Sequence, residues 1–288
     1  SLTATSGADS LIFLELTITS SPTVDLGNDQ NICAGDSVLL DAGAGHTNYL
    51  WSTGDTTQTI YASSAGSYSV TVGNGTPVIN SNSLSFDGQD DYVDFGNISN
   101  INDATFSFWI KTNETTGYNL LLNKDCDGCE NSSGDWNFYT TNGETGRIDF
   151  SINNSSGNIY VPGNVINDDN WYHIALTRNS TSGEVKFYID GNLVNSGIGP
   201  VGLVTNSNNL QFGIQQIYNP AYYQGLLDDL SIWSNVLNQS EIQNLMINPP
   251  VYNEPGLVGY WNFNEGTGSV ASDLTNNGNN ATIFGASW

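Results

Sequence analysis

The chain has 288 residues and carries 29 Asp+Glu against 5 Lys+Arg, which gives a formal net charge of −24. Nucleic acid and anionic membrane surfaces are therefore unsuitable partners, because proteins bind both through cationic side chains. A hydrophobic content of 38% with 11% aromatic residues predicts a globular chain. The chain contains no apolar run long enough to predict insertion into a membrane.

The residue pattern is typical of an all-β protein. Short runs rich in Val, Ile, Phe, Tyr and Thr alternate with Gly, Asn, Asp and Ser, as in β-sandwiches. These polar loops and the scarcity of Lys favour an extracellular or outer-cell-surface protein. Divalent cations are natural companions of so many carboxylates, although a charged and soluble surface explains the same composition.

Two breaks divide the chain into three parts. Residues 1–21 hold one strand-like run, LIFLELTI, which ends before Pro22. A second β unit covers 22–78, and a large β-sandwich covers 79–288, with Gly and Pro near the boundary. We therefore expect the end of a preceding unit, a small domain and a large domain.

The small unit carries an ordered set of motifs, namely DLGND, CAGDSVLLDAG, YLWSTGDTTQTI and GSYSVTV. It resembles the Ig-like, PKD-like repeats of large secreted proteins from Bacteroidetes, and 7–18 resembles the closing strands of another such repeat. The resemblance implies a small Ig-like β-sandwich that serves as a spacer or adhesive stalk. It also implies a core position for Trp51. We expect Cys33 to be a buried free thiol, because the unit offers it no partner.

The clearest strands of the large unit follow one another at short intervals. They are 106–112, 119–124, 136–141, 147–153, 171–178 and 184–190. Asp190-Gly191 then supplies the positive φ angles of a tight hairpin turn. The one convincing helix is NQSEIQNLM at 238–246, with Asn238 or Ser240 as its cap.

Four motifs of the large unit occur in a characteristic order. They are SLSFDGQDDYVDFGN, ATFSFWIKT, WYHIALTRNSTSGEVKFYIDGNLV and LLDDLSIWSNVLNQSEIQNLM. They resemble the laminin G-like, concanavalin A-like β-jelly roll that pentraxins also use. On this resemblance we assign the tryptophans of the strand motifs to packing, namely Trp109, Trp171, Trp233 and Trp261. The segment 256–288 precedes the FDG strand in many bacterial members, so here it either closes this sandwich or opens another repeat; we favour closure.

The same fold also carries glycoside hydrolases and polysaccharide lyases. Retaining hydrolases use two carboxylates about 5 Å apart, and no ExDxE pattern places such a pair on one strand face. A lyase needs a Tyr/His pair, but the only histidines are His46, in a loop, and His173, to which the resemblance gives a framework role. Nucleophile-elbow, phosphate-loop and HExxH motifs are absent from the sequence. We therefore expect a non-catalytic protein.

Residues 124–135, KDCDGCENSSGD, suggest several kinds of site. Zinc needs four Cys or His ligands, and a redox dithiol needs a helix N-terminus, whereas this loop has one Cys-x-x-Cys pair between strands. We expect Cys126 and Cys129 to form a disulfide in an oxidising compartment. The loop carboxylates are hard oxygen ligands that suit Ca²⁺, namely Asp125, Asp127, Glu130 and Asp135. A solvated acidic loop without an ion is the alternative.

The pentraxin resemblance bears on the calcium prediction. In pentraxins, calcium ligands stand at the start of the strand after this loop, which is the position of Asp135 here. Pentraxins also have a pair of acidic ligands in a later segment, and the matching segment around Gln215 lacks that pair. The resemblance therefore implies one ion rather than two. A second, structural calcium position is suggested by Asp87 in FDG and by Asp228-Asp229 in LLDDLSIW, where capping of backbone amides is the alternative.

A glycan platform is predicted from aromatic and amide residues near the same rim of the sandwich. Sugar rings stack on aromatic faces while amides, carboxylates and calcium bind hydroxyls. The candidate ligand-binding residues are Trp136, Gln215, Gln216, Tyr218, Asn219, Tyr222 and Tyr223. The alternative is that the tyrosines cover a sheet edge and that Trp136, which begins a strand, lies in the core.

These features predict a non-catalytic module of a large, secreted, adhesin-like bacterial surface protein. The module binds a polysaccharide or cell-surface glycan with the help of calcium, and its other partners are further domains of the same protein. Such binding is weak at one site and gains strength by repetition. The alternatives are a structural stalk without a small ligand and, less favoured, a polysaccharide-degrading enzyme.

Overall fold

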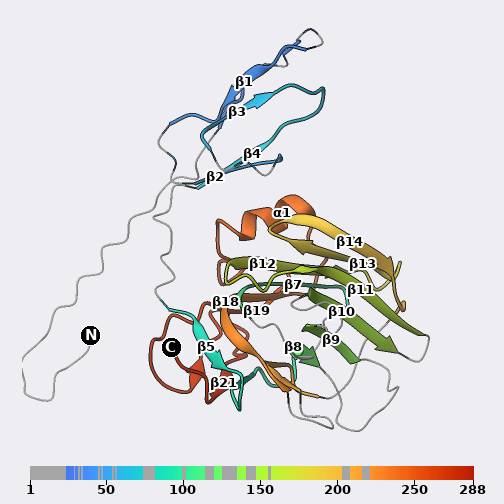
Figure 1. Cartoon of the computed structure of the whole chain (residues 1–288), viewed down its shortest axis with the longest axis vertical. Coiled ribbons are helices and arrows are strands. Elements are labelled where there is room, and N and C mark those ends of the chain that lie inside the picture. Colours follow the sequence, from blue (N-terminus) through green and yellow to red (C-terminus); the bar gives the residue numbers. More distant parts are fainter. Residues whose placement is uncertain are drawn as a thin grey trace, which may run out of the picture. The chain divides into compact units, whose positions relative to one another are not determined.

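The computed structural model forms two compact units, Ser1–Gly75 and Thr76–Trp288 (Figure 1). It describes residues 24–28, 30–31, 33, 35–44, 46, 48–53, 55, 57–73, 82–98, 102–113, 120–124, 135–140, 147–154, 157–202, 208–215 and 221–288. Among these residues, no helix has the length and hydrophobicity that crossing a membrane requires.

The first unit consists of two antiparallel strand pairs around one tryptophan. β1 (Val38–Asp41) pairs with β3 (Thr59–Ala62), and β2 (Asn48–Trp51) pairs with β4 (Val70–Gly73). Trp51 is fully buried, and its indole N–H donates to the carbonyl of Thr57 at 2.7 Å. The expected core position of Trp51 is therefore confirmed. Cys33 is exposed rather than buried, because it lies in the turn before β1, which the Asp36 N–H to Cys33 carbonyl bond closes.

The second unit is a sandwich of two antiparallel sheets. The eight-stranded sheet has the order β11 (Gly157–Val165), β10 (Arg147–Asn154), β9 (Asp135–Thr140), β8 (Leu120–Lys124), β15 (Gln211–Phe212), β6 (Tyr92–Asp94), β21 (Ala281–Phe284) and β20 (Val270–Ala271). The seven-stranded sheet has the order β14 (Asn192–Ile198), β13 (Glu184–Ile189), β12 (Trp171–Arg178), β7 (Ala104–Lys111), β18 (Gln224–Trp233) and β19 (Leu257–Trp261), with β5 (Leu84–Asp87) also on β18. A small hairpin joins β16 (Ile214–Gln215) to β17 (Ala221–Tyr222).

The core lies between the two sheets and is rich in aromatic rings. Phe108 of β7 meets Phe138 of β9 with ring centroids 5.5 Å apart, edge to face, which is a favoured aromatic geometry. Residues alternate along each strand, so every second side chain of the eight-stranded sheet faces away from this core. On β6, Val93 is fully buried in the core, and Tyr92 and Asp94 therefore face outward.

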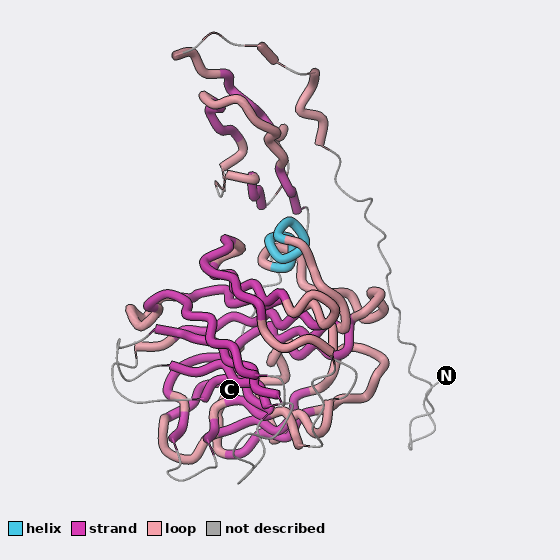
Figure 2. The backbone as a smooth tube through the Cα atoms, turned by 90° about the vertical axis from the view of Figure 1, so that its right-hand side faces the viewer, coloured by secondary structure: helices cyan, strands magenta, loops and turns pink. Residues whose placement is uncertain are grey.

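The expected hairpin and helix both form. Asp190 and Gly191 have φ angles of 49° and 68° and connect β13 to β14. The helix α1 (Gln239–Leu245) begins after Asn238, whose side chain accepts the Glu241 N–H while the Glu241 carboxylate accepts the Asn238 N–H. α1 lies outside the strands (Figure 2) and buries Ile242 against the outer face of the seven-stranded sheet.

Residues 256–288 complete both sheets of this sandwich. β19 pairs with β18 in one sheet, and β21 pairs with β6 in the other. Trp261 is fully buried in the core between the sheets, and Trp233 is buried under α1. The packing role expected for Trp171 is wrong, because its side chain is 38% exposed at the start of β12.

Candidate functional site

Most of the predicted rim lies outside the residues that the structure describes. This holds for the acidic Cys-x-x-Cys loop with Asp125, Cys126, Asp127, Cys129 and Glu130, and for Gln216, Tyr218 and Asn219. Asp135 begins β9 and Gln215 ends β16, but their side chains are outside the description too. The calcium loop, the disulfide and most of the tyrosine platform therefore stay predictions.

Two of the predicted platform residues belong to the core. Trp136 is 3% exposed and packs against Phe106, with ring centroids 4.5 Å apart. Tyr223 is 1% exposed, and its hydroxyl donates to the carbonyls of Lys111 and Leu226. Neither ring has a free face for a sugar, so both are removed from the predicted ligand-binding set.

Asp87 and Asp228 do not share a metal site. β5 pairs with β18 so that Asp87 lies opposite Gln224, four residues before Asp228. At the usual rise of a strand, that offset is about 13 Å. The Asp228 carboxylate is buried and accepts the N–H of Asp229 at 2.9 Å. The strands that carry Asp87 and Asp228 are thus neighbours in the fold, but the two carboxylates lie too far apart to bind one ion.

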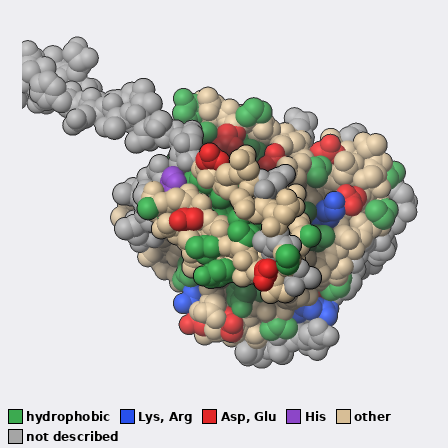
Figure 3. Space-filling model, turned by 90° about the horizontal axis from the view of Figure 1, so that it is seen from above, with side chains coloured by type: hydrophobic (Ala, Val, Ile, Leu, Met, Phe, Trp, Pro, Cys, Tyr) green, Lys and Arg blue, Asp and Glu red, His purple; other side chains and the backbone are tan. Residues whose placement is uncertain are grey.

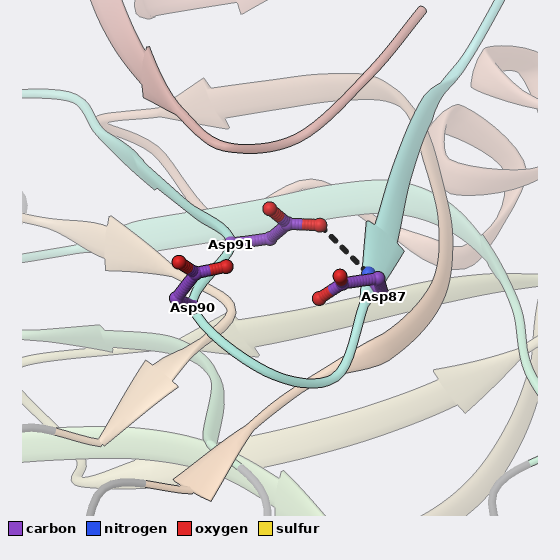
Figure 4. A group of neighbouring side chains, drawn as sticks. All are labelled: Asp87, Asp90 and Asp91. Atoms are coloured by element: carbon purple, nitrogen blue, oxygen red, sulfur yellow. Dashed lines mark hydrogen bonds between the residues drawn. The ribbon is translucent and has the colours of Figure 1, made fainter.

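Asp87 instead joins two carboxylates of its own turn, Asp90 and Asp91; we call these three residues the acidic turn (Figure 4). Their oxygens lie within 4.8 Å of one another. Two oxygens that bind one Ca²⁺ at about 2.4 Å can be separated by up to about twice that distance, so the spacing fits a calcium ion. Ca²⁺ also needs further oxygens, which waters or ligand hydroxyls would supply.

Internal hydrogen bonds hold the acidic turn in shape. Asp91 Oδ2 accepts the N–H of Asp87 at 2.7 Å, and Asp87 Oδ1 accepts the N–H of Gln89 at 2.8 Å. Burial raises the pKa of Asp91, and the nearby charges of Asp87 and Asp90 raise it further. The hydrogen bond from the Asp87 N–H acts in the opposite direction and lowers it. A bound cation would relieve this repulsion. The residues therefore fit a metal, but they also form a complete turn without one.

An aromatic pair stands directly beside the acidic turn. Tyr92 follows Asp91 on β6, and Phe284 faces it from β21, with ring centroids 4.4 Å apart and ring planes inclined by 8°. Phe284 is 41% exposed, whereas Tyr92 is half-buried. Gly285 continues β21 past Asp91, where a Cβ would come within 2.1 Å of Asp91 Oδ1. The two features thus form one continuous surface.

Polar groups surround this aromatic pair on the outer face of the eight-stranded sheet. Asp94 accepts bonds from Asn209 Nδ2 at 3.0 Å, from Gln211 Nε2 at 3.0 Å and from the Gly96 N–H at 2.7 Å. Burial raises the pKa of Tyr92, and the nearby Asp94 and Tyr222 raise it further. Tyr222, which the sequence predicted as a ligand-binding residue, therefore lies close to the pair.

Sequence analysis did not identify Tyr92, Phe284, Asp90, Asp91 or Asp94 as functional residues. The signal for the acidic turn was present, because Asp-Gly-Gln-Asp-Asp places three carboxylates around one tight turn. The signal for the aromatic pair was not local. Tyr92 and Phe284 meet only because β21 pairs with β6, at the opposite end of the domain sequence.

His173 has the framework role that the resemblance implied. Its side chain is 1% exposed, and its Nε2 lies 2.8 Å from the Ser107 hydroxyl. Burial lowers the pKa of His173 to about 3, so the imidazole stays neutral in the folded protein at neutral pH. The structure thus gives His173 a buried, hydrogen-bonded position within the seven-stranded sheet.

The small unit contains an open groove of about 730 Å³. Its lining is made of small, amide and hydroxyl side chains with a few apolar ones, and Leu26, Leu40 and Tyr68 are among them. Among the residues that the structure describes, no charged side chain contributes to this lining.

The large unit identifies the family of the chain. Residues 87–243 match the laminin G model of the concanavalin A-like lectin/glucanases superfamily. This match covers more than half of the chain, and the chain belongs to this superfamily.

The chain is similar to several proteins of known sequence or structure. The chain is 28% identical over 194 residues to the rat protein "Sushi, von Willebrand factor type A, EGF and pentraxin domain-containing protein 1" and 27% identical to its mouse counterpart. The match covers 62% of this chain but only 5% of those relatives. A solved structure titled a putative carbohydrate binding protein from Bacteroides ovatus has a TM-score of 0.57 at 14% identity, covering 89% of this chain and 69% of that one. The latter similarity concerns the fold.

Proposed function

We propose that the large unit is a non-catalytic, lectin-like module that binds a carbohydrate through the outer face of its eight-stranded sheet. The observation that supports this most strongly is the exposed aromatic pair, Tyr92 and Phe284, set among fixed carboxylate and amide groups. Such a surface offers a flat face for the apolar side of a sugar and hydrogen-bond partners for its hydroxyls.

We propose that calcium takes part in carbohydrate binding at this site. The acidic turn adjoins the aromatic pair, and a Ca²⁺ held by Asp87, Asp90 and Asp91 would present its open coordination positions to sugar hydroxyls. The 125–135 loop is the other proposed calcium site. The carboxylates of the acidic turn come from a single tight turn, which favours ion binding over the two opposed carboxylates of a glycosidase.

The surroundings of the module are proposed from composition and resemblance. A large excess of carboxylates, few Lys residues and an Ig-like first unit support a secreted or surface-attached bacterial protein with further domains. In that setting the first unit is a spacer, and weak binding at each module adds up along the parent protein. The second candidate function is a stalk without a ligand, which the resemblance of the first unit to spacer repeats favours.

A binding screen tests the proposal. The whole chain is applied to polysaccharides and a glycan array in millimolar calcium and again in EDTA. We expect binding that is at least about tenfold weaker in EDTA, because the ion would contact the sugar. Asp90→Asn should reproduce the EDTA effect, whereas Asp36→Asn, an equal loss of one exposed carboxylate in the first unit, should not.

Each other outcome of the screen has a definite meaning. Binding that is equal in calcium and EDTA contradicts the calcium role but supports the carbohydrate module. No binding under either condition contradicts the carbohydrate module and favours the stalk.

A further inference from the structure

We infer that the side chains of this face accept neutral or amino sugars and reject sialylated, uronic or sulfated ones, which bind here only where a cation bridges them to the protein. This inference rests on the proposed function and names the chemical class of the ligand. It follows from the position and partners of every basic side chain in the chain, all of which lie among the described residues.

Both arginines are engaged within the fold. Arg178 is 3% exposed and donates its guanidinium N–H groups to three backbone carbonyls. Arg147 forms a forked pair with the buried carboxylate of Asp149, with N···O distances of 3.0 and 3.1 Å. Arg147 lies on β10, four strands from β6, which is roughly 19 Å at the usual strand spacing.

The three lysines are engaged as well. Lys111 and Lys186 belong to the seven-stranded sheet and pair with Asp169 at 3.5 Å and Glu184 at 3.0 Å. Lys124 is 4% exposed, and its Nζ donates to Asn97 Oδ1 at 2.8 Å. Burial lowers the pKa of Lys124 to about 8, so part of its charge is already lost near neutral pH.

Histidine does not supply the missing charge. His173 is buried and neutral, and His46 belongs to the first unit. Specific recognition of a carboxylate or sulfate in proteins uses Arg or Lys in a charge-assisted hydrogen bond. The outer face around Tyr92 and Phe284 has no such group among the described residues.

The groups that do surround the aromatic pair are acidic. Asp87, Asp90 and Asp91 adjoin it on one side and Asp94 on another, and the chain as a whole carries a net charge of −24. Figure 3 shows acidic side chains with few basic ones on another face of the molecule, the one seen from above. At about 0.1 M salt this repulsion reaches roughly 10 Å from the surface, so it opposes an anionic sugar before contact.

Matched glycan pairs test the inference, each pair having one backbone with and without its sialic acid, carboxylate or sulfate. Binding is measured in EDTA, so that a cation cannot bridge an acidic sugar to the protein. We expect the acidic member of each pair to bind at least about tenfold more weakly at low salt, with the gap narrowing near 1 M salt. Thr282→Lys, beside Phe284 on the exposed side of β21, should restore binding of the acidic member.

The matched control is Thr181→Lys, which adds the same charge in the exposed turn after β12 and should not restore binding. Acidic and neutral members bound equally by the natural protein in EDTA would overturn the inference and leave the carbohydrate module in place. Equal effects of the two Lys variants would overturn the role given to the charges around Phe284. No binding of any glycan, in calcium as well as in EDTA, would overturn the proposed function, and the inference with it.

Discussion

At the scale of single residues, the candidate site depends on how tightly the carboxylates of the acidic turn are crowded. Asp91 is buried, its pKa is raised by burial and by its neighbours, and its Oδ1 faces the backbone of Gly285. A raised pKa means that the folded protein holds this proton more strongly than the unfolded chain does. Ionised Asp91 therefore lowers the free energy of unfolding at neutral pH, and the stability returns as the pH falls to the ordinary carboxyl range.

The crowding of carboxylates around Asp91 predicts the effect of Asp91→Asn. The amide oxygen can still accept the Asp87 N–H, and the charge repulsion is gone. We expect the variant to melt at a higher temperature than the natural protein in EDTA at pH 7. Calcium should raise the melting temperature of the natural protein and not that of the variant, as differential scanning calorimetry would measure. A natural protein whose melting is unchanged by calcium would contradict the metal role of the turn.

At the scale of elements, α1 shows how a short segment is held by its first turn. The helix spans Gln239–Leu245, too few residues to be stable alone, and it depends on its cap and on Ile242 in the cluster beneath it. Asn238 and Glu241 exchange bonds of 3.1 and 2.6 Å between side chains and backbone N–H groups. This reciprocal cap satisfies two backbone donors that the helix itself leaves unpaired.

Removal of the cap should therefore have a measurable cost. We expect Asn238→Ala to lower the free energy of unfolding by about 1 kcal/mol, measured by urea titration. Ser240→Ala, an exposed polar side chain of the same helix, should change it by less than about 0.5 kcal/mol. Equal losses in the two variants would show that the cap does not stabilise the helix.

At the scale of the whole molecule, stability depends on polar groups that the fold buries. His173 is a buried group that makes the free energy of unfolding depend on acidic pH, because burial lowers its pKa to about 3 from an unfolded value of 6.5. Between these values the unfolded chain binds a proton that the folded protein does not. Stability is therefore complete above pH 6.5 and decreases as the pH falls toward 3, by up to about 1.4 kcal/mol per pH unit.

The histidines provide a matched pair for this prediction. We expect His173→Gln to flatten the decrease in the free energy of unfolding between pH 6.5 and 4, measured by denaturant titration at each pH. His46→Gln, in the first unit, should keep the slope of the natural protein. The prediction fails if His173→Gln and the natural protein lose stability in parallel over this interval.

The sequence contained enough local information for many strands, the Asp190-Gly191 turn and the helix cap, whereas the jelly-roll fold was inferred from the family resemblance. Alternating apolar residues located β7, β10, β12 and β13 within two residues, because strand side chains alternate between core and solvent. The Asp190-Gly191 turn and the Asn238 cap were visible for the same reason, since both act within a few residues. The sequence allowed Trp136 to be either a ligand-binding residue or a core residue. Its contact with Phe106 in the structure shows that it lies in the core.

The site was less accessible to sequence reasoning, because strand pairing assembles it. Tyr92 and Asp94 share a face of β6, but that face becomes a candidate site only beside Phe284 of β21 and Gln211 of β15. The prediction concentrated on loops in which aromatic and amide residues are close in sequence, such as the one around Tyr222. Pairing between distant segments follows from topology, which a local pattern does not contain.

The most direct test of the account is the affinity of Phe284→Ala for the best glycan from the screen, measured by isothermal titration calorimetry. We predict that Phe284→Ala binds the glycan at least about tenfold more weakly than the natural protein does, because the exposed aromatic face for stacking is lost. Tyr252→Ala, which removes another exposed aromatic ring of the same unit, should bind as the natural protein does. Unchanged affinity in Phe284→Ala, with its fold intact by circular dichroism, would contradict the location of the site on this face.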